Sequence, residues 1–318
     1  MPVEKITEKW KSSINIVTIG NGDSAIKVGG ETTLPFLFDE GKMPHRPLIA
    51  LEIYDMVPDG WPEPLNNLLQ DVINDPVAWA KKGQDEWGAD LICLRLLKPS
   101  VVDTPPEESA QLAKAIKDAT NIPMILWPMA EDEAKNKLYS ACSQALAGER
   151  CLIGTTKQDD YKILAAICIA DGHSVIAESP LDINICKQVN ILLSDMGLPT
   201  DRIVVYPNNG VLGYGFEYAY SIMERTRIAA LSGDRMMAMP ILAVVGSECQ
   251  RVKEVKATST EFPQWGSEIE RGIAWEAATA VGYLQAGADI LTMCHPEAIK
   301  LVKGYIDEAI DIIGNKSN

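Results

Sequence analysis

The stretch LIALEIYDM (48–56) is a nearly continuous run of apolar residues bounded by polar segments. Parallel strands that are buried on both faces have this composition, whereas half-exposed strands alternate apolar and polar residues. Seven similar runs follow, and each precedes a longer segment with helical periodicity. These runs lie at 91–97, 124–129, 151–156, 174–180, 203–208, 240–247 and 288–294.

Eight strand–helix units in one chain predict an α/β fold, namely a closed (β/α)8 TIM barrel. A doubly wound open sheet with eight parallel strands is the structural alternative. Residues 14–30 precede these units and predict two short strands around the turn NGDS. We therefore divide the chain into an N-terminal extension with a β-hairpin (1–47) and the barrel (48–318).

Capping residues mark the ends of the last two helices. Ser267 with Glu270 fits a capping box, and Gly287 is placed to end the same helix. Pro296 stands where the last helix should begin. The inward apolar stripe of that helix is predicted at Ile299, Val302, Ile306, Ile310 and Ile313.

The chain is acidic, with 44 Asp and Glu against 29 Lys and Arg and a net charge of −15. Such a surface repels phosphate backbones and anionic lipids, so nucleic acids and membrane surfaces are not expected partners. The N-terminus lacks the apolar core of a secretory signal, and no stretch approaches the ~18 apolar residues of a membrane span. We expect a soluble, cytoplasmic protein.

Cysteines and histidines argue against a metal centre on this chain. The seven cysteines are odd in number, lack CxxC spacing and lie mostly in apolar runs, which predicts reduced, buried thiols. The same pattern predicts neither an iron–sulfur cluster nor a structural zinc here. Of the three histidines, only His295 follows a strand and precedes a helix, where it either binds a ligand or caps the helix.

Three long connections emerge on the C-terminal face, where barrels carry their sites. They span 57–76, 207–217 and 247–267. In PNNGVLGYGFE (207–217), Gly210 and Gly213 allow the backbone to approach a ligand, although glycines also serve plain turns. The other two loops carry aromatic residues, which suit either a protein interface or a lid over the barrel's own mouth.

Two motif fragments are interpreted as turns. GNGDSA (20–25) precedes a strand instead of a helix, so it is a hairpin turn and not a dinucleotide site. Asp171-Gly172-His173 resembles the start of the Asp-x-His-x-x-Gly signature of cobalamin proteins, but Ile176 replaces the glycine. The tripeptide also lies at the wrong end of its strand, which favours a helix C-cap turn.

Two charged residues, Glu52 and Arg95, fall in the middle of predicted strands 1 and 2. Because buried charges must be paired, we expect a structural ion pair inside the barrel. A catalytic acid at Glu52 is the minority interpretation.

Several sequence blocks resemble one family. They are SPLDINICKQ (179–188), LGYGFEYAYSIMER (212–225), MPILAVVG (239–246), FPQWG…ERGIAWEA (262–277) and HPEA (295–298). In this order they resemble the small (delta) subunit of the corrinoid iron–sulfur protein of the CO dehydrogenase/acetyl-CoA synthase system. The resemblance runs from GGETTLPF (29–36) to near the C-terminus. One departure is Tyr206, where family members tend to carry an acid, so no role is assigned to an acid there.

The resemblance implies a barrel similar to pterin-dependent methyltransferases, paired with a large (gamma) subunit that carries a [4Fe-4S] cluster and a corrinoid-binding domain. The corrinoid (cobalamin) would lie between the two chains. It would take a methyl group from methyltetrahydrofolate, with a separate methyltransferase, and deliver it to acetyl-CoA synthase/CO dehydrogenase. This is the reductive acetyl-CoA (Wood–Ljungdahl) pathway of carbon fixation in anaerobes.

We therefore expect a corrinoid-holding subunit in which the cofactor supplies the chemistry, with no catalytic residue and no metal ligand on this chain. The alternatives are a stand-alone pterin-dependent methyltransferase, for which the sequence shows no convincing Asp and Asn set, and a purely structural scaffold. The candidate cofactor-binding residues lie at strand ends and in loops of the C-terminal face: Thr155, Ser179, Asn208, Asn209, Gly210, Gly213, Gly246, Ser247 and His295.

Overall fold

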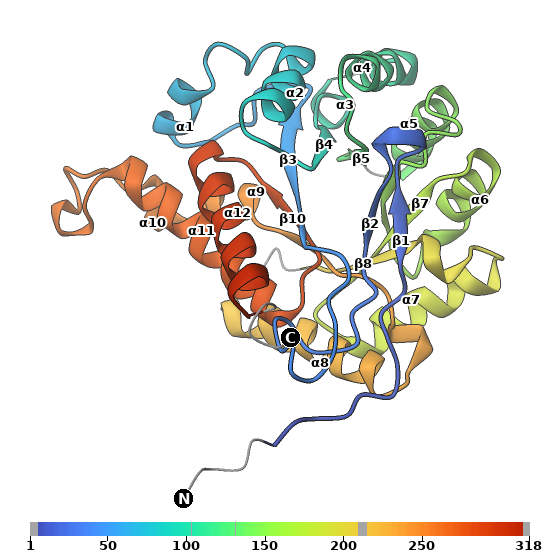
Figure 1. Cartoon of the computed structure of the whole chain (residues 1–318). Coiled ribbons are helices and arrows are strands. Elements are labelled where there is room, and N and C mark those ends of the chain that lie inside the picture. The colour runs from blue at the N-terminus through green and yellow to red at the C-terminus, as the bar shows by residue number, and fades with distance from the viewer. Residues whose placement is uncertain (1–5, 103, 131, 209–214, 314–318) are drawn as a thin grey trace, which may run out of the picture.

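The computed structural model describes residues 6–102, 104–130, 132–208 and 215–313. Eight parallel strands follow one another in the order β8-β7-β6-β5-β4-β3-β10-β9, and a bridge between Val205 and Ile241 joins β8 to β9 (Figure 1). The predicted (β/α)8 barrel is therefore confirmed, and the open-sheet alternative is wrong. The strands are β3 (Leu48–Tyr54), β4 (Leu91–Leu96), β5 (Met124–Pro128), β6 (Leu152–Thr156), β7 (Ser174–Ser179), β8 (Ile203–Pro207), β9 (Leu242–Val244) and β10 (Ile290–Met293).

An outer ring of helices covers the strands (Figure 1). The long ones are α2 (Pro76–Asp85), α4 (Pro106–Ala119), α5 (Asp132–Ala145), α6 (Tyr161–Asp171), α7 (Ile183–Asp195), α8 (Phe216–Leu231), α11 (Glu268–Ala286) and α12 (Pro296–Glu308). Short helices within connections are α1 (Glu63–Leu68), α3 (Lys98–Val101), α9 (Gly246–Arg251) and α10 (Lys253–Lys256), with 3-10 turns η1 (Gly22–Ser24), η2 (Thr200–Arg202), η3 (Arg235–Met237) and η4 (Pro263–Trp265) and a π-helical turn η5 (Ala309–Ile313).

Most of the predicted helix ends are confirmed. Gly287 ends α11 with a left-handed φ of 111°, and Pro296 is the first residue of α12. Ser267 is the N-cap of α11, as predicted. Its side chain makes no capping hydrogen bond, however, so the predicted capping box with Glu270 does not form. The stripe of α12 is buried at Ile299, Val302 and Ile306.

The N-terminal hairpin closes the end of the barrel at which the strands begin. We call this the lower end, and the end at which the strands finish the upper end. β1 (Val17–Ile19) pairs antiparallel with β2 (Ile26–Val28), and η1 makes the turn between them, as predicted for GNGDSA. The hairpin side chains Val17, Ile19 and Val28 are at most 1% exposed. They pack into one apolar cluster with inward-facing strand residues that include Leu48, Leu91, Leu152, Leu242 and Ile290.

A second, larger apolar layer lies between the strands and the helices. All seven cysteines are buried and unpaired, mostly in this layer, and burial raises the pKa of their thiols. Gly172 ends α6 in the left-handed conformation, and the His173 ring is buried between the Cys151 amide and the Ser143 carbonyl. The tripeptide at 171–173 is thus the predicted helix turn.

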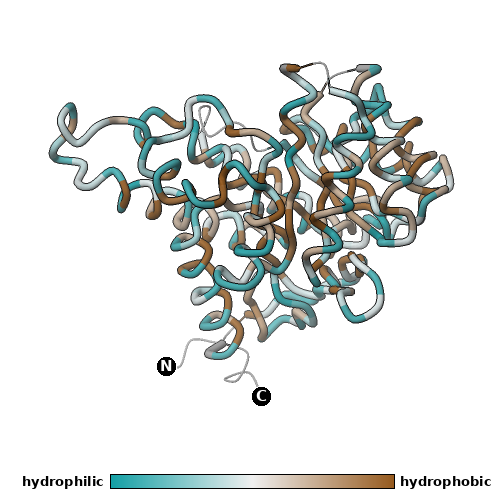
Figure 2. Tube along the Cα trace, turned by 90° about the horizontal axis from the view of Figure 1, so that it is seen from above, coloured by the Kyte–Doolittle hydropathy of each residue, from teal (hydrophilic) through white to brown (hydrophobic). Residues whose placement is uncertain are grey.

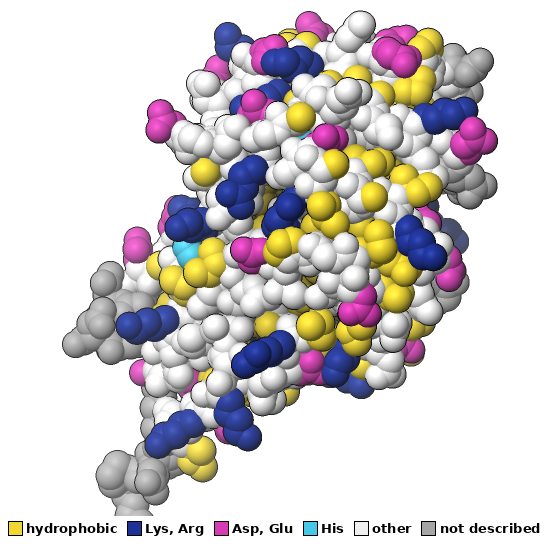
Figure 3. Space-filling model, turned by 90° about the vertical axis from the view of Figure 1, so that its right-hand side faces the viewer, with side chains coloured by type: hydrophobic (Ala, Val, Ile, Leu, Met, Phe, Trp, Pro, Cys, Tyr) yellow, Lys and Arg dark blue, Asp and Glu magenta, His cyan; other side chains and the backbone are white. Residues whose placement is uncertain are grey.

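The outer surface is uneven. Figure 2 shows hydrophobic positions concentrated in the barrel and hydrophilic ones toward its outside. On the side formed by α5, α6 and α7, hydrophobic side chains gather across the middle of the face (Figure 3), and Ile163 and Ile169 of α6 are 47% and 38% exposed. None of the helices within the described ranges has the length and apolar character needed to cross a membrane.

Candidate functional site

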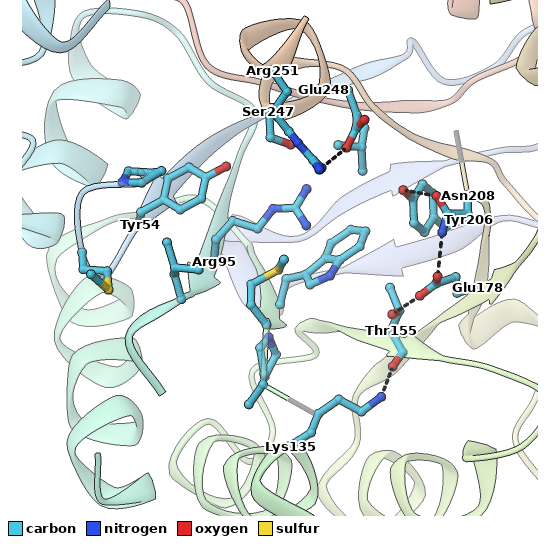
Figure 4. A pocket seen from close by; sticks show the side chains of 18 of the residues that line it. Tyr54, Arg95, Lys135, Thr155, Glu178, Tyr206, Asn208, Ser247, Glu248 and Arg251 are labelled. Carbon is cyan, nitrogen blue, oxygen red and sulfur yellow. Dashed lines mark hydrogen bonds and ion pairs between the residues drawn. The ribbon is translucent and has the colours of Figure 1, made fainter. Parts of the chain in front are cut away.

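A cavity of about 1050 Å³ opens at the C-terminal ends of the strands. Its walls come from the ends of β3 to β9 and from the connections that follow them, so residues far apart in the sequence share it (Figure 4). This is the end of the barrel at which the sequence placed the site. The lining mixes aromatic, cationic, acidic and amide side chains.

The floor of the cavity is built around Glu52, which is completely buried on β3. Its Oε1 accepts hydrogen bonds from Thr292 Oγ1 at 2.5 Å and Ser247 Oγ at 3.3 Å, and Tyr54 OH donates to Oε2 at 2.6 Å. Arg95 Nη2 lies 3.3 Å from Oε1. Burial alone would raise the pKa of Glu52, but Arg95 and the hydrogen bonds from Thr292 and Tyr54 lower it overall. The predicted ion pair is confirmed.

Arg95 joins this ion pair to an aromatic wall. Its guanidinium carbon lies 3.9 Å from the centroid of the Trp127 ring, and Tyr206 meets Trp127 edge-on at 5.2 Å. Arg95 is 4% exposed and lines the cavity, and Figure 4 shows its guanidinium pointing toward the cavity centre. The cation is therefore held in place by the carboxylate on one side and the indole on the other.

A chain of hydrogen bonds crosses the opposite wall (Figure 4). Tyr206 OH donates to Asn208 Oδ1 at 3.1 Å, and Asn208 Nδ2 donates to Glu178 Oε1 at 2.9 Å. Thr155 Oγ1 donates to Glu178 Oε2, and Lys157 Nζ lies 3.5 Å from Glu178 Oε1. Residues at the ends of β6 and β8 thus converge on the carboxylate of Glu178, at the end of β7.

Residues behind this wall fix the position of Thr155. Its carbonyl oxygen accepts a hydrogen bond from Tyr139 OH at 2.7 Å, and Lys135 Nζ lies 3.5 Å from the same oxygen. Lys135 is paired with Asp160 at 2.6 Å. Asp160 also accepts from Thr156 Oγ1 at 2.8 Å, so the strand end is held from two sides.

The connection after β9 forms another edge of the mouth. Ser247 and Glu248 line the cavity, and Arg251 lies 3.2 Å from Glu248. Burial raises the pKa of the Glu248 carboxyl, Arg251 lowers it, and Glu52 raises it further, with a net increase. Gly246 faces the other way, because a Cβ there would lie 2.5 Å from the Cys294 amide nitrogen.

A separate buried carboxylate supports the end of β10. Glu276 Oε1 accepts from the amides of Cys294 at 2.7 Å and His295 at 3.0 Å, and Gln250 Nε2 donates to Oε2 at 2.9 Å. Burial raises its pKa from 4.5 to about 7, against the effect of these hydrogen bonds. This group lies in the layer behind the cavity and does not line it.

The structure brings only part of the candidate set together. Thr155, Asn208 and Ser247 line the cavity, as the sequence suggested. Asn209, Gly210 and Gly213 lie outside the described residues. Three other candidates point elsewhere: Ser179 is fully buried beside Cys186, Gly246 packs on the β10 backbone, and His295 caps α12 by accepting from the Glu297 amide at 3.2 Å.

The aromatic residues of the long loops divide between the two interpretations. Trp61 is 8% exposed and packs edge-on against Tyr54 at 5.1 Å, so it covers the barrel's own mouth. Phe262 and Trp265 are 36% and 41% exposed to solvent and do not line the cavity. Trp127, Glu178 and Lys135 carry no signal in the sequence that marks them as site residues, because each lies in an apolar strand run or in a helix without a motif.

The cavity is lined by groups that can bind a polar ligand. The lining contains hydroxyl, amide and carboxylate groups and one buried cation, whereas the buried cysteines have raised pKa values and do not face the cavity. Among the described residues, no cluster of His, Cys, Asp and Glu could hold a metal ion.

Known proteins with this fold include dihydropteroate synthases. The enzymes from Xanthomonas albilineans and Thermus thermophilus superpose with a TM-score of 0.56 each, at 15% and 14% identity. The superpositions cover 85% and 91% of this chain and 96% and 98% of those chains. At this identity the likeness concerns the fold alone.

Sequence comparison identifies the family. A family described as CO dehydrogenase/acetyl-CoA synthase delta subunit matches residues 16–302. Acetyl-CoA decarbonylase/synthase complex subunit delta of Methanosarcina mazei is 31% identical over 325 residues, covering 96% of this chain and 74% of that protein. The subunit of the same name from Methanopyrus kandleri is 32% identical over 286 residues, covering 89% and 70%. The chain belongs to the CO dehydrogenase/acetyl-CoA synthase delta subunit family.

Proposed function

We propose that this chain holds one side of a corrinoid at its barrel mouth, as the small subunit of a corrinoid iron–sulfur protein. When bound, a corrinoid supplies a cobalt centre that accepts a methyl group and passes it on. The observation that carries the proposal is the wide cavity, lined by both polar and aromatic side chains, at the open end of a barrel in this family.

The polar groups of the mouth fit a flat macrocycle fringed with amide groups, because hydroxyl and carboxylate oxygens can accept hydrogen bonds from it. The Asn208 amide and the Ser247 and Thr155 hydroxyls enter the cavity from three different strand ends. Glu178 offers acceptor oxygens for amide N–H groups, while Trp127 and Tyr206 provide an apolar surface below them. These residues would orient the cofactor and keep water from its lower edge.

On this proposal, none of the three histidines of this chain coordinates the cobalt. His295 caps α12, His173 lies buried at the other end of the barrel, and His45 contacts the Gly29 carbonyl in the N-terminal extension. Axial ligation is one of the means by which a protein tunes the metal of a macrocycle. On this proposal, the chain positions and shields the cofactor without adding a histidine ligand.

We also propose that this chain acts together with three partner proteins. A large (gamma) subunit would carry the [4Fe-4S] cluster and the other half of the corrinoid site. A methyltetrahydrofolate methyltransferase would supply the methyl group, and acetyl-CoA synthase/CO dehydrogenase would receive it. Membership in a family of complex subunits supports the existence of partner chains, and the mouth provides a surface that a partner can cover.

The test is to purify the chain alone and together with the large subunit, and to record visible spectra for corrinoid. We expect corrinoid to be retained by the pair and lost from either chain alone. Thr155→Val should weaken retention by the pair, since it removes the hydroxyl but keeps the volume. Corrinoid that stays with the large subunit in full when this chain is removed would contradict the proposal.

A matched control exists in the same chain. Thr226 of α8 is 1% exposed and its hydroxyl has no partner among the described residues, so Thr226→Val should leave retention unchanged. Bulky replacements of Gly210 and Gly213 should also weaken retention. Unchanged retention in those variants would remove the 207–217 loop from the site.

A second candidate function is a pterin-dependent methyltransferase. The observation that favours it is the convergence of Glu178, Asn208 and Thr155 on one wall of the cavity, a set that the sequence alone did not reveal. Such groups can hydrogen-bond the edge of a flat heterocycle. Methyl transfer from methyltetrahydrofolate to free cobalamin by the isolated chain would establish this function in place of the first.

A further inference from the structure

A segment between α10 and α11 projects from the barrel (Figure 1), and we call residues 257–267 the aromatic arm. Every residue from 260 to 267 is exposed. At its tip the rings of Phe262 and Trp265 stack with their centroids 4.1 Å apart and 10° between their planes. Two large aromatic side chains held against each other in solvent are unusual on a surface and typical of protein interfaces.

The arm is held in one shape by its own hydrogen bonds. Glu261 Oε2 accepts from Thr258 Oγ1 at 2.9 Å, the Ser259 amide donates to Glu268 Oε1 at 2.8 Å, and Ser259 Oγ donates to the Gly266 carbonyl at 3.1 Å. A loop that is already ordered loses less conformational entropy when it binds. The exposed rings are therefore presented in a fixed position.

Beneath the arm, a groove of about 510 Å³ runs along α11. Trp265, Trp275, Ala274 and Ala278 give it mainly apolar walls, and Arg271 lies within it. Next to the groove, Ile269 is 54% exposed. An apolar side chain from another protein could enter this groove between the two tryptophans.

Arg271 is the second, independent feature of the groove. Its Nη2 donates to the Ala257 carbonyl, and its guanidinium carbon lies 5.7 Å from the Trp265 ring centroid. Its Nε and Nη1 atoms are buried, and neither has an acceptor among the described residues. Buried N–H groups without partners destabilise a protein, so an incoming carbonyl or carboxylate oxygen would relieve this cost after a small adjustment of the side chain.

The arm is continuous with the mouth. It follows α9, whose Ser247, Glu248 and Arg251 line the cavity, and the buried Val255 anchors α10 between the two. A body that covers the mouth therefore also reaches the base of the arm. This continuity selects the protein that shares the cavity as the occupant of the groove.

Charge argues against a second copy of this chain as the occupant. Each copy carries a net charge of −15, and Glu261, Glu268 and Glu270 lie on or beside the arm. A symmetric contact would place these acids opposite one another, because the same patch is used on both copies.

We propose that the aromatic arm is the anchor for the corrinoid-bearing partner subunit. The partner would insert an apolar side chain between Trp265 and Trp275 and offer an oxygen acceptor to Arg271. This inference rests on the proposed function, since it takes the partner to be the chain that completes the cofactor site.

The test measures the affinity between this chain and the large corrinoid-bearing subunit of the same complex by titration calorimetry. Trp265→Ala should weaken binding about thirty-fold, and Arg271→Gln about ten-fold, as expected for central Trp and Arg anchors. Trp265→Phe should recover part of the loss. Met196→Ala, at the end of α7 and 38% exposed, is the matched control and should bind like the unchanged chain.

The outcomes separate this inference from the proposed function. If Trp265→Ala and Arg271→Gln fold normally and bind the large subunit as tightly as the unchanged chain, the anchor is wrong, whatever the corrinoid spectra show. A chain that dimerises alone through Trp265 would also overturn it. If the unchanged pair assembles in a Trp265-dependent manner but retains no corrinoid, the anchor holds and the proposed function fails.

Discussion

The same strands line both ends of the barrel interior, but their side chains are apolar at the lower end and include charged groups at the upper end. At the lower end, Val17 and Ile19 of the hairpin belong to one apolar cluster with Leu48 and Leu91. At the upper end, the strands beside them carry Glu52, Arg95 and Glu178. The first end is closed by a plug, whereas the second opens into the cavity.

The difference teaches how charge is tolerated inside this barrel. Each of these upper charges has a hydrogen-bond or ion-pair partner on another strand or strand end. The apolar cluster at the lower end contributes stability by burial alone. Barrels in general separate a stable lower face from a functional upper face.

The largest effect is expected from breaking the upper ion pair. Arg95→Met would leave Glu52 completely buried without its cation, and should lower the free energy of unfolding by about 4 kcal/mol in urea titrations. Adding Glu52→Gln to this variant should restore much of the loss, because the unpaired charge is then removed.

The surface pair Arg46–Asp307 is the control for this experiment. Its atoms are 3.0 Å apart, but its side chains are 40% and 55% exposed, so Arg46→Met should change stability far less. Equal losses at the two sites would show that the upper barrel is not an enclosed environment.

Weakening the lower plug should have the next largest effect. Ile19→Ala would leave a cavity at a position that is 0% exposed, and should lower the free energy of unfolding by about 3 kcal/mol. Corrinoid retention by the pair should not change, since the plug lies at the far end of the barrel. Ile26→Ala, at a partly buried hairpin position, is the control and should cost less. A loss of corrinoid in Ile19→Ala would break the separation between the two ends.

A third effect distinguishes two buried carboxylates. The pKa of Glu276 is raised from 4.5 to about 7, so the folded chain binds its proton more tightly than the unfolded chain. The contribution of Glu276 to stability is therefore greatest below pH 4.5, and falls by about 3 kcal/mol as the pH rises to about 7. Glu276→Gln should remove this part of the pH dependence in thermal unfolding.

Glu52 has the opposite sign. Its lowered pKa means that its contribution to stability is present above the ordinary carboxyl pKa and is lost as the pH falls through the folded value. Subtracting the pH profile of Glu276→Gln from that of the unchanged chain should leave a curve that declines between pH 4.5 and about 7. A curve that rises over this range would contradict the raised pKa of Glu276.

The smallest effect is expected at Ser247, which joins the connection after β9 to Glu52 in the floor of the cavity. Ser247→Ala removes one hydrogen bond to Glu52, at 3.3 Å, and should lower the free energy of unfolding by about 1 kcal/mol. Because Thr292, Tyr54 and Arg95 still hold Glu52, the ion pair should persist. A loss of stability as large as that of Arg95→Met would mean that the Glu52–Arg95 ion pair forms only when Ser247 is present.

Much of this architecture could be predicted from local patterns. The apolar runs, the hairpin turn at 20–25 and the helix boundary at Pro296 depend on residues close in sequence. The pairing of Glu52 with Arg95 was also predictable, because two charges in adjacent buried strands have few other partners. The aligned residues of β3 and β4 confirm that these strands are neighbours.

The membership of the site was only partly predictable. Thr155 and Ser247, which were suggested because they follow strand ends, line the cavity, whereas Ser179 and Gly246, suggested by the same rule, pack away from it. Trp127 and Glu178 were missed, since a residue within an apolar run points inward or outward according to strand register and barrel stagger, which a single strand does not reveal.

By itself, the sequence determined a (β/α)8 barrel, and it predicted a site at the C-terminal ends of the strands, where the cavity lies. The reason is that burial on both faces and helical periodicity are local properties of composition. Only the tertiary structure decided which groups share the cavity, that His295 caps a helix, and that Arg271 faces a groove with unpaired N–H groups. Those facts depend on the closure of the barrel, which brings residues from distant strands to one place.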